Sequence, residues 1–294
     1  MVDQIALSNR GAVLFVVGLA AFFLVLWWFL RWLYVDRQIF TRLGRRVAGY
    51  YEAPRSRKYR DVLETWFPRA WPFIEGRFDP RHFQGLPLTL LILAGAYTAF
   101  LFVGLVEEVM ESEEVVAVDE FFTSLVAPLR NPILTRVLSG LTQLGSTATL
   151  AAVAIVSTGF LWVRGPVWGI PALWITVVGS QVTTWSGKFL IDRPRPEFIL
   201  DVTAASPSFP SGHATGAMAV YGILAYVLSR DLPNRRRRFD LIYWICALIA
   251  IIALSRIYLS VHYPSDVGAG LLVGGFWVLA GMVVAESLRD KSDS

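Results

Sequence analysis

Long uncharged apolar runs recur along the chain and alternate with short polar segments. Five runs have the length that a transmembrane helix needs, about 17 to 25 residues. They occupy residues 11–30, 86–105, 147–163, 167–185 and 267–285. Two shorter runs, at 214–228 and 241–255, reach this length only if each extends past an ionisable neighbour, and we count both as spans. The pattern therefore predicts an all-α, polytopic membrane helix bundle with seven transmembrane helices.

The first apolar run lies close to the amino terminus, so a cleaved signal peptide is the alternative interpretation. Its leader carries Asp3 as well as Arg10. Its apolar part is too long for a signal peptide and ends at Trp27 and Trp28 without a small-residue cleavage pattern. We therefore interpret residues 1–35 as a retained transmembrane helix.

Basic residues gather in some connecting segments and avoid others. Twelve Lys or Arg lie in 31–81, whereas 106–146 holds two basic residues beside seven acidic ones. By the positive-inside rule the first segment is cytoplasmic and the second lies outside. Continued alternation places 188–211 and 256–266 outside and the arginines at 235–238 inside. The predicted amino terminus is then outside and the carboxy terminus cytoplasmic.

Two connecting segments have a character of their own. The segment 36–85 combines basic and aromatic residues, which favours a position along the anionic inner leaflet over binding to nucleic acid. In the outer loop, apolar residues recur at helical spacing, which predicts interfacial helices broken near Pro128 and Pro132.

Composition agrees with a membrane protein. Hydrophobic residues make up 55% of the chain and charged residues 17%, an apolar share above that of soluble domains, and this also excludes intrinsic disorder. The single cysteine, Cys246, excludes a disulfide framework and a cysteine metal cluster. The net charge of +4 comes from short segments between spans, so membrane topology explains it better than nucleic acid does.

Ionisable residues concentrate in three short segments that the topology places on the outer face. Charged groups at the edge of a bilayer cost free energy, so a convergent set of them indicates a functional site. The set consists of Lys188, Arg193, Arg195, His213, Arg256, His262 and Asp266.

The cations in this set suit a phosphoryl group. Lys188, Arg195 and Arg256 can bind an anion that has several oxygens. The residues 210–213 directly precede an apolar helix, whose free backbone N–H groups add an anion site, and Gly212 permits close approach.

The histidines supply the groups that phosphoryl transfer needs. Asp266 follows His262 by four residues, so on a helix both would share one face. The carboxylate can hold one ring nitrogen and leave the other as a nucleophile, while His213 acts as an acid on the leaving oxygen. The alternative is a metal site of two histidines and one carboxylate, which the three nearby cations oppose.

Three motifs with fixed internal spacing occur in order along the chain. They read Lys188-(FLIDRP)-Arg195-Pro196, Pro210-Ser211-Gly212-His213 and Ser255-Arg256-(IYLSV)-His262-(YPS)-Asp266. Together they resemble the signature of the type 2 phosphatidic acid phosphatase family, the integral membrane lipid phosphate phosphatases. The resemblance covers 86–285 and implies a six-helix phosphatase core, with the amino-terminal helix as an addition.

The resemblance implies a metal-independent reaction that uses no cofactor. In it His262 attacks phosphorus to form a phosphohistidine, Asp266 orients this histidine, and His213 protonates the departing group. The residues implied in phosphate binding are Lys188, Arg195, Ser211, Gly212 and Arg256. The resemblance gives no role to Arg193. Soluble acid phosphatases and vanadium haloperoxidases carry the same motifs, but the predicted spans exclude those soluble settings.

We therefore divide the chain into four parts. These are an amino-terminal transmembrane helix (1–35), a basic-aromatic segment (36–85), a lipid phosphatase core (86–288) and a cytoplasmic tail (289–294). We expect a bacterial inner-membrane protein whose active site opens at the outer face. The expected partners are the membrane and a phosphorylated lipid, with no nucleic acid.

The substrate stays open among undecaprenyl diphosphate, phosphatidic acid and phosphatidylglycerol phosphate. One alternative function is a phosphotransferase, in which an acceptor hydroxyl replaces water. Another is a lipid transporter or lipid-binding protein that uses the cationic cluster without chemistry.

Overall fold

The computed structural model describes residues 2–36, 49, 65–68, 76–79, 82–196 and 206–292, with side chains between 17 and 290. Within these ranges the secondary structure is helical, without a strand. The long helices are α1 (Val2–Arg31), α5 (Leu86–Glu111), α8 (Thr147–Arg164), α9 (Gly169–Ile191), α10 (Gly212–Arg230), α11 (Arg235–Tyr258) and α12 (Pro264–Ser292). Short helical turns follow three of the helices, namely η1 (Trp32–Asp36), η2 (Ala127–Leu129) and η3 (Gln143–Gly145).

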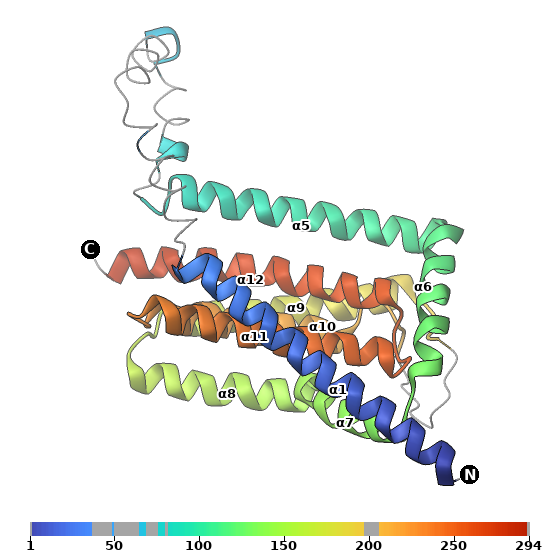
Figure 1. The fold of residues 1–294 in the computed structure, drawn as a ribbon. Helices are drawn as coiled ribbons and strands as arrows, with labels where there is room; N and C mark the ends of the chain where they lie inside the picture. The colour runs from blue at the N-terminus through green and yellow to red at the C-terminus, as the bar shows by residue number, and fades with distance from the viewer. Residues whose placement is uncertain are drawn as a thin grey trace.

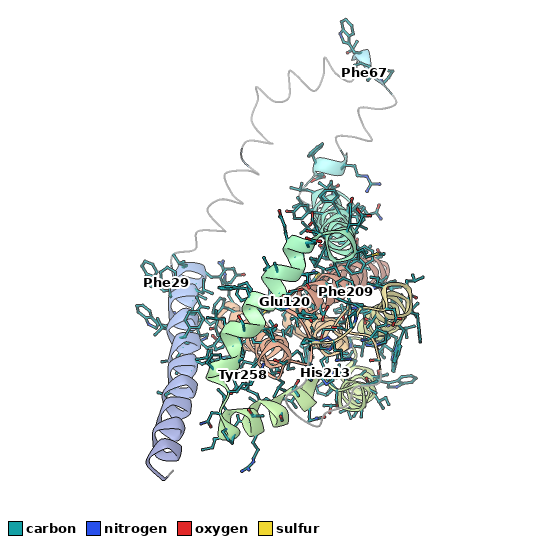
Figure 2. The ribbon with its side chains drawn as sticks, turned by 90° about the vertical axis from the view of Figure 1, so that its right-hand side faces the viewer. Phe29, Phe67, Glu120, Phe209, His213 and Tyr258 are labelled. Carbon is teal, nitrogen blue, oxygen red and sulfur yellow. The ribbon has the colours of Figure 1, made fainter. Side chains whose placement is uncertain are left out.

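Six of the long helices form a bundle, and α1 is added to its outside (Figure 1). The bundle helices are α5, α8, α9, α10, α11 and α12. In Figure 1, α1 crosses this bundle diagonally, and in Figure 2 it stands at the edge. The fold is therefore the predicted six-helix core with one extra amino-terminal helix, and the protein is an integral membrane protein.

The helix α10 lies at the centre of the bundle and packs against α9, α11 and α12. Small residues allow this close approach: a Cβ added at Gly274 of α12 would lie 2.6 Å from the Cβ of Met218 and 2.7 Å from the carbonyl oxygen of Thr215. Helices inside a membrane depend on such contacts because lipid provides no hydrophobic drive for association. The short apolar run at 214–228 thus forms a central helix that the other helices cover.

Five helical stretches in the described part of the chain are long and apolar enough to cross a membrane by themselves. They are Val17–Val35, Leu86–Glu111, Thr147–Arg164, Arg235–Tyr258 and Pro264–Asp290. The run at 167–185, one of the five strongest in the sequence, forms α9 but is not among them. Its Thr176, Ser180 and Thr184 are buried in the bundle, where each hydroxyl donates to a helix carbonyl 2.8–2.9 Å away. These polar residues lower the hydropathy of α9, but they face other helices and are not exposed to lipid.

The segment 106–146, predicted to be an outer loop, contains α6 (Glu113–Val126) and α7 (Pro132–Thr142). The predicted break near Pro128 and Pro132 is confirmed. It consists of η2 and the cap residue Asn131, whose side chain accepts a hydrogen bond of 2.8 Å from the backbone N–H of Ile133. In Figure 1, α6 stands across the ends of the bundle helices.

The carboxyl-terminal half of α1 and the turn η1 both contact α11. The Trp27 indole donates to Asp240 over 3.0 Å, and the rings of Tyr34 and Phe239 stack with centroids 5.6 Å apart. The predicted inner-leaflet segment 36–85 lies largely outside the described residues.

Candidate active site

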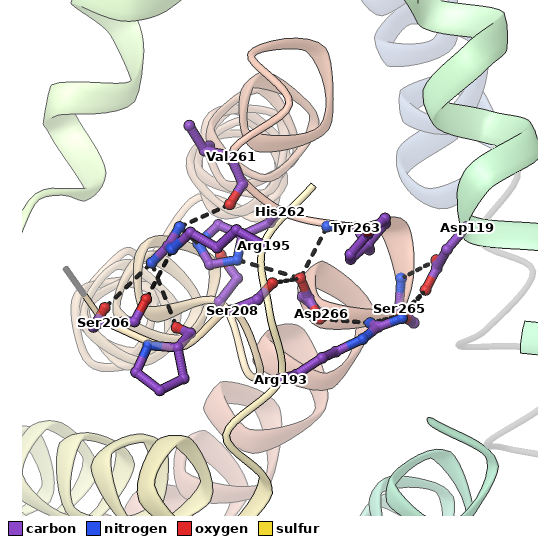
Figure 3. A network of polar contacts seen from close by, with 12 residues as sticks. Asp119, Arg193, Arg195, Ser206, Ser208, Val261, His262, Tyr263, Ser265 and Asp266 are labelled. Atoms are coloured by element: carbon purple, nitrogen blue, oxygen red, sulfur yellow. Dashed lines mark hydrogen bonds and ion pairs between the residues drawn. The ribbon is translucent and has the colours of Figure 1, made fainter. Parts of the chain in front are cut away.

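The three motifs meet at the end of the bundle that α6 crosses. We call this end, with the loops 192–196, 206–211 and 259–263, the site end, and the other end of the bundle the opposite end. Asp192 ends α9 in a left-handed conformation (φ 45°) and turns the chain into the first loop. The predicted convergence of the motifs at one end is therefore present in the fold, and Figure 3 shows residues of the first and third motifs together.

The loop at 259–263 carries His262 between α11 and α12. Ser260 reverses the chain in a left-handed conformation (φ 51°), and its hydroxyl accepts a hydrogen bond from the guanidinium of Arg130. His262 precedes α12, so the prediction that His262 and Asp266 share the face of one helix was wrong in detail. The turn that starts α12 nevertheless brings them together.

His262 and Asp266 are buried side by side, with side chains 2% and 0% exposed. Nδ1 of His262 lies 3.5 Å from Oδ2 of Asp266. The same oxygen accepts hydrogen bonds from the backbone N–H of Tyr263 (2.9 Å) and from the hydroxyl of Ser208. The carboxylate is thus held in place and faces one nitrogen of the imidazole.

Arg195 lies on the other side of the same imidazole. Its Nη1 is 3.3 Å from Nε2 of His262 and donates to the carbonyl of Val261 over 2.7 Å. Its Nε donates to the carbonyl of Ser206 over 2.8 Å. Nε2, the nitrogen that faces away from Asp266, therefore points toward positive charge.

The other two cations predicted to bind phosphate also bond to neutral oxygens. Lys188 is buried in the last turn of α9, and its Nζ donates to the carbonyl of Pro207, which Arg195 also approaches at 3.4 Å. Arg256 is buried near the end of α11 and donates to the hydroxyl of Thr142 over 3.2 Å.

Apart from Nδ1 of His262, which faces Asp266 at 3.5 Å, two buried side-chain donors at the site end have no hydrogen-bond partner within the described chain. They are Nε of Arg256 and the hydroxyl of Ser211. Buried polar groups are nearly always satisfied in proteins, so such atoms call for a ligand or water. Both belong to residues that the resemblance implies in phosphate binding.

His213 lies in the first turn of α10, with Gly212 and Ser211 directly before it. Its imidazole packs on Gly145, where an added Cβ would lie 3.3 Å from Cδ2. Charges from the other two motifs act on this ring, namely those of Arg256, His262, Arg195 and Lys188. The backbone N–H of Ser211 donates to the carbonyl of Asp266 over 3.0 Å, which joins the start of α10 to the start of α12.

Burial lowers the pKa of His262 to about 4. The positive charges of Arg195 and Arg256 act in the same direction, and Asp266 acts against them. The imidazole is therefore neutral at pH 7 and keeps a free lone pair, as a nucleophile requires.

Two residues that hydrogen-bond to Asp266 or Arg193 could not be identified as site residues from the sequence. Ser208 lies between the first two motifs, and Asp119 lies in α6, far from all three. Only the folded chain brings Ser208 to Asp266 and Asp119 to Arg193.

The fold is an all-α membrane bundle, and its candidate site is a buried histidine–carboxylate pair set among cations and unsatisfied donors. Residues 168–289, which contain all three motifs, match the PAP2 superfamily. The chain belongs to this superfamily, that of the type 2 phosphatidic acid phosphatases.

Individual relatives agree with this assignment. The chain is 33% identical over 178 residues to phosphatidylglycerophosphatase B of Bacillus subtilis. This alignment covers 60% of this chain and 87% of the relative. It is 28% identical over 168 residues to lipid A 1-phosphatase of Rhizobium etli, covering 49% of this chain and 68% of the relative.

A solved structure is similar as well. It is the transmembrane PAP2 type phosphatidylglycerolphosphate phosphatase from Bacillus subtilis, with a TM-score of 0.60 and 26% identity. The similarity covers 67% of this chain and 96% of that one, so it extends over most of the helix bundle.

Proposed function

We propose that the protein is a lipid phosphatase that removes phosphate from a lipid phosphate or diphosphate through a phosphohistidine on His262. One observation carries the proposal: Nδ1 of His262 faces Asp266, while Nε2 faces the guanidinium of Arg195. A nucleophile oriented on one side and a cation placed beside its reactive nitrogen are what in-line phosphoryl transfer requires. The names of the two curated relatives, both phosphatases of phosphorylated lipids, support the substrate class.

The first step forms a bond from Nε2 of His262 to phosphorus and breaks the bond from phosphorus to the leaving oxygen. His213 gives this oxygen a proton, so the lipid leaves as an alcohol, or as a lipid phosphate when the substrate is a diphosphate. In the second step water attacks the phosphohistidine, its proton passes to His213, and phosphate leaves. The enzyme returns to its starting state, and one water is consumed.

The cations stabilise charge that develops on the phosphoryl oxygens. In our proposal Lys188, Arg195 and Arg256 bind these oxygens, and Ser211 and Gly212 add a hydroxyl and backbone N–H groups at the start of α10. The unpartnered hydroxyl of Ser211 and Nε of Arg256 support this assignment, because a bound phosphoryl group would satisfy both. The proposed reaction uses neither a metal nor a cofactor.

The proposed orientation places the site end at the outer face of a bacterial inner membrane. Basic residues support it, because Arg230, Arg289 and the arginines at 235–238 lie at the opposite end. In this orientation the amino terminus is outside and the carboxy terminus is cytoplasmic. A lipid can then present its phosphate to the site while its tails stay in the bilayer.

The test is phosphate release by the detergent-purified protein, in EDTA, from undecaprenyl diphosphate, phosphatidic acid and phosphatidylglycerol phosphate. We expect His262→Ala to lower release by about 10⁴-fold, as loss of a nucleophile does in comparable enzymes. His82→Ala is the matched control, because His82 is exposed at the opposite end beside Asp79; it should retain wild-type activity.

Three results would contradict the proposal. They are no release from any of the three lipids by folded wild-type protein, release that persists in His262→Ala, and release that requires an added divalent metal. Transfer of the phosphate to an added alcohol, with no release to water, would favour the phosphotransferase.

A further inference from the structure

Arg193 joins two buried carboxylates at the site end. Its Nη1 donates to Oδ1 of Asp266 over 2.7 Å, and its Nη2 donates to Oδ2 of Asp119 over 2.8 Å (Figure 3). The three side chains are nearly inaccessible, with exposed fractions of 9%, 0% and 2% for Arg193, Asp266 and Asp119. A planar guanidinium can bridge two carboxylates in this way, whereas a lysine ammonium cannot reproduce the geometry.

Asp119 contributes this contact from α6, an element outside all three motifs. Its Oδ1 accepts the backbone N–H of Ser265 over 3.0 Å, and its Oδ2 also accepts the hydroxyl of Ser265. Nη1 of Arg193 donates to the same hydroxyl over 2.7 Å. Asp119 therefore grips both the arginine and the first turn of α12.

The two carboxylate oxygens of Asp266 contact different residues. Oδ1 is held by Arg193, while Oδ2 faces the imidazole of His262. Because a carboxylate is planar, fixing one oxygen fixes the direction of the other. The position of Arg193 thus sets the direction from which Asp266 meets His262.

Arg193 remains charged in this buried position. Burial lowers its pKa, but the carboxylates of Asp266 and Asp119 more than offset that effect and raise the pKa above its ordinary value. The ring of Tyr263 also lies 4.4 Å from the guanidinium carbon and covers the cation.

We propose that Asp119 and Arg193 are positioning residues, which orient Asp266 and, through it, the nucleophile His262; this inference rests on the proposed function. Asp119 holds Arg193 from α6, and Arg193 holds Asp266. Without Asp119, the arginine loses one of its two carboxylate partners and Asp266 loses its fixed direction. The rate of the reaction then depends on the position of α6 against the bundle. The side chains of Phe121, Phe122 and Leu125 on this helix are exposed on the surface of the bundle.

The test compares Asp119→Asn, Arg193→Gln and the double variant in the full-length protein. We expect Asp119→Asn to lower kcat about 10-fold and Arg193→Gln about 100-fold, as misplacement of a catalytic group does. KM and the inhibition constant of inorganic phosphate should change less than about threefold, because the phosphate-binding cations stay in place. The control is Glu120→Gln, which removes an exposed carboxylate one residue away on α6 and should leave kcat within about twofold.

The double variant separates positioning from general structural damage. If Asp119 acts through Arg193, the double variant should be no slower than Arg193→Gln alone, because coupled residues are not additive. Independent effects that multiply in the double variant would overturn the inference, as would a wild-type kcat in Asp119→Asn.

A folding defect is handled by a milder variant. If Asp119→Asn does not elute as folded protein in size-exclusion chromatography, Ser265→Ala takes its place, since this hydroxyl contacts both Asp119 and Arg193. It should lower kcat about threefold at unchanged KM, and a wild-type kcat would overturn the inference. Inactive wild type or active His262→Ala would instead reject the proposed function, so the two failures are distinguishable.

Discussion

The helix α12 carries a buried carboxylate at each end, and the two carboxylates have different surroundings. At the opposite end, Glu286 accepts hydrogen bonds from the hydroxyl of Tyr226 and from Arg230 (2.8 Å), and Arg289 lies 3.5 Å away. At the site end, Asp266 is bonded by several donors, yet its Oδ2 still faces a neutral histidine at 3.5 Å. Glu286 therefore contacts only side chains that stabilise the bundle, whereas Asp266 also faces His262, the proposed nucleophile.

The cations differ in the same way. Arg230 forms an ion pair with Glu286 at 2.7 Å. At the site end Arg193 is paired with carboxylates, but in the described ranges Lys188, Arg195 and Arg256 have no carboxylate within 4.0 Å and donate to carbonyl or hydroxyl oxygens. Unneutralised charge of this kind costs stability and is typical of a ligand site. The proposed function accounts for this contrast: paired charges at the opposite end stabilise the bundle, and cations without a carboxylate partner at the site end are free to bind a phosphoryl group.

The largest expected effect is a loss of activity when a cation at the site end is removed. Arg256→Gln should lower kcat/KM about 10²–10³-fold, because one cation on the phosphoryl oxygens is lost. Its melting temperature should equal or exceed that of the wild type, since repulsion from Arg195 is relieved. Arg230→Gln is the matched control, and we expect it to melt earlier with kcat/KM within about twofold. If both variants lost activity equally, the distinction between the two ends would fail.

A pH profile sharpens the comparison. Because the pKa of His262 is lowered to about 4, protonation of this imidazole should lower kcat/KM about tenfold per pH unit only below about pH 4, while loss of the proton from His213 limits the alkaline side of a bell-shaped profile. An unperturbed histidine would lose activity from about pH 6.5.

The residual activity of Arg256→Gln identifies the group that titrates. Removing this positive charge raises the pKa of His262, so the acidic limb should move to higher pH, while the titration of the substrate stays unchanged. An acidic limb near pH 6.5 that is the same in both proteins would contradict the assignment to His262.

The smallest effect on activity is expected at the opposite end. Glu286→Gln weakens the bonds to Tyr226 and Arg230 and should cost about 1–3 kcal/mol of stability. Its kcat should stay within about twofold of wild type, because Glu286 lies at the far end of α12 from Asp266. Thermal unfolding and phosphate release, measured on the same preparation, check this prediction. A large loss of kcat at normal folded yield would show that the opposite end takes part in catalysis.

Much of the fold could be predicted because apolar runs and prolines act locally. The long helices and the break at 127–131 follow from residues that are close in sequence. The low hydropathy of α9 could not be interpreted without its neighbours, since Thr176 and Ser180 are polar in sequence but face other helices.

The motif residues were predictable because their spacing is fixed, but the residues outside the motifs that hold them in position were not. Asp119 lies 146 residues before Ser265, its hydrogen-bond partner, and nothing in the acidic stretch around it distinguishes it from Glu120. Burial separates the two, and burial depends on how α6 lies across the bundle (Figure 2).

The central claim is that the phosphoryl group passes through His262. Its most direct test is to quench the wild-type reaction with a lipid phosphate within milliseconds and to locate covalent phosphate by mass spectrometry under alkaline conditions, where phosphohistidine is stable. The account predicts phosphate on the peptide that carries His262, present within the first turnover and absent in His262→Ala. Turnover without any covalent phosphate, or with phosphate on another residue, would contradict it.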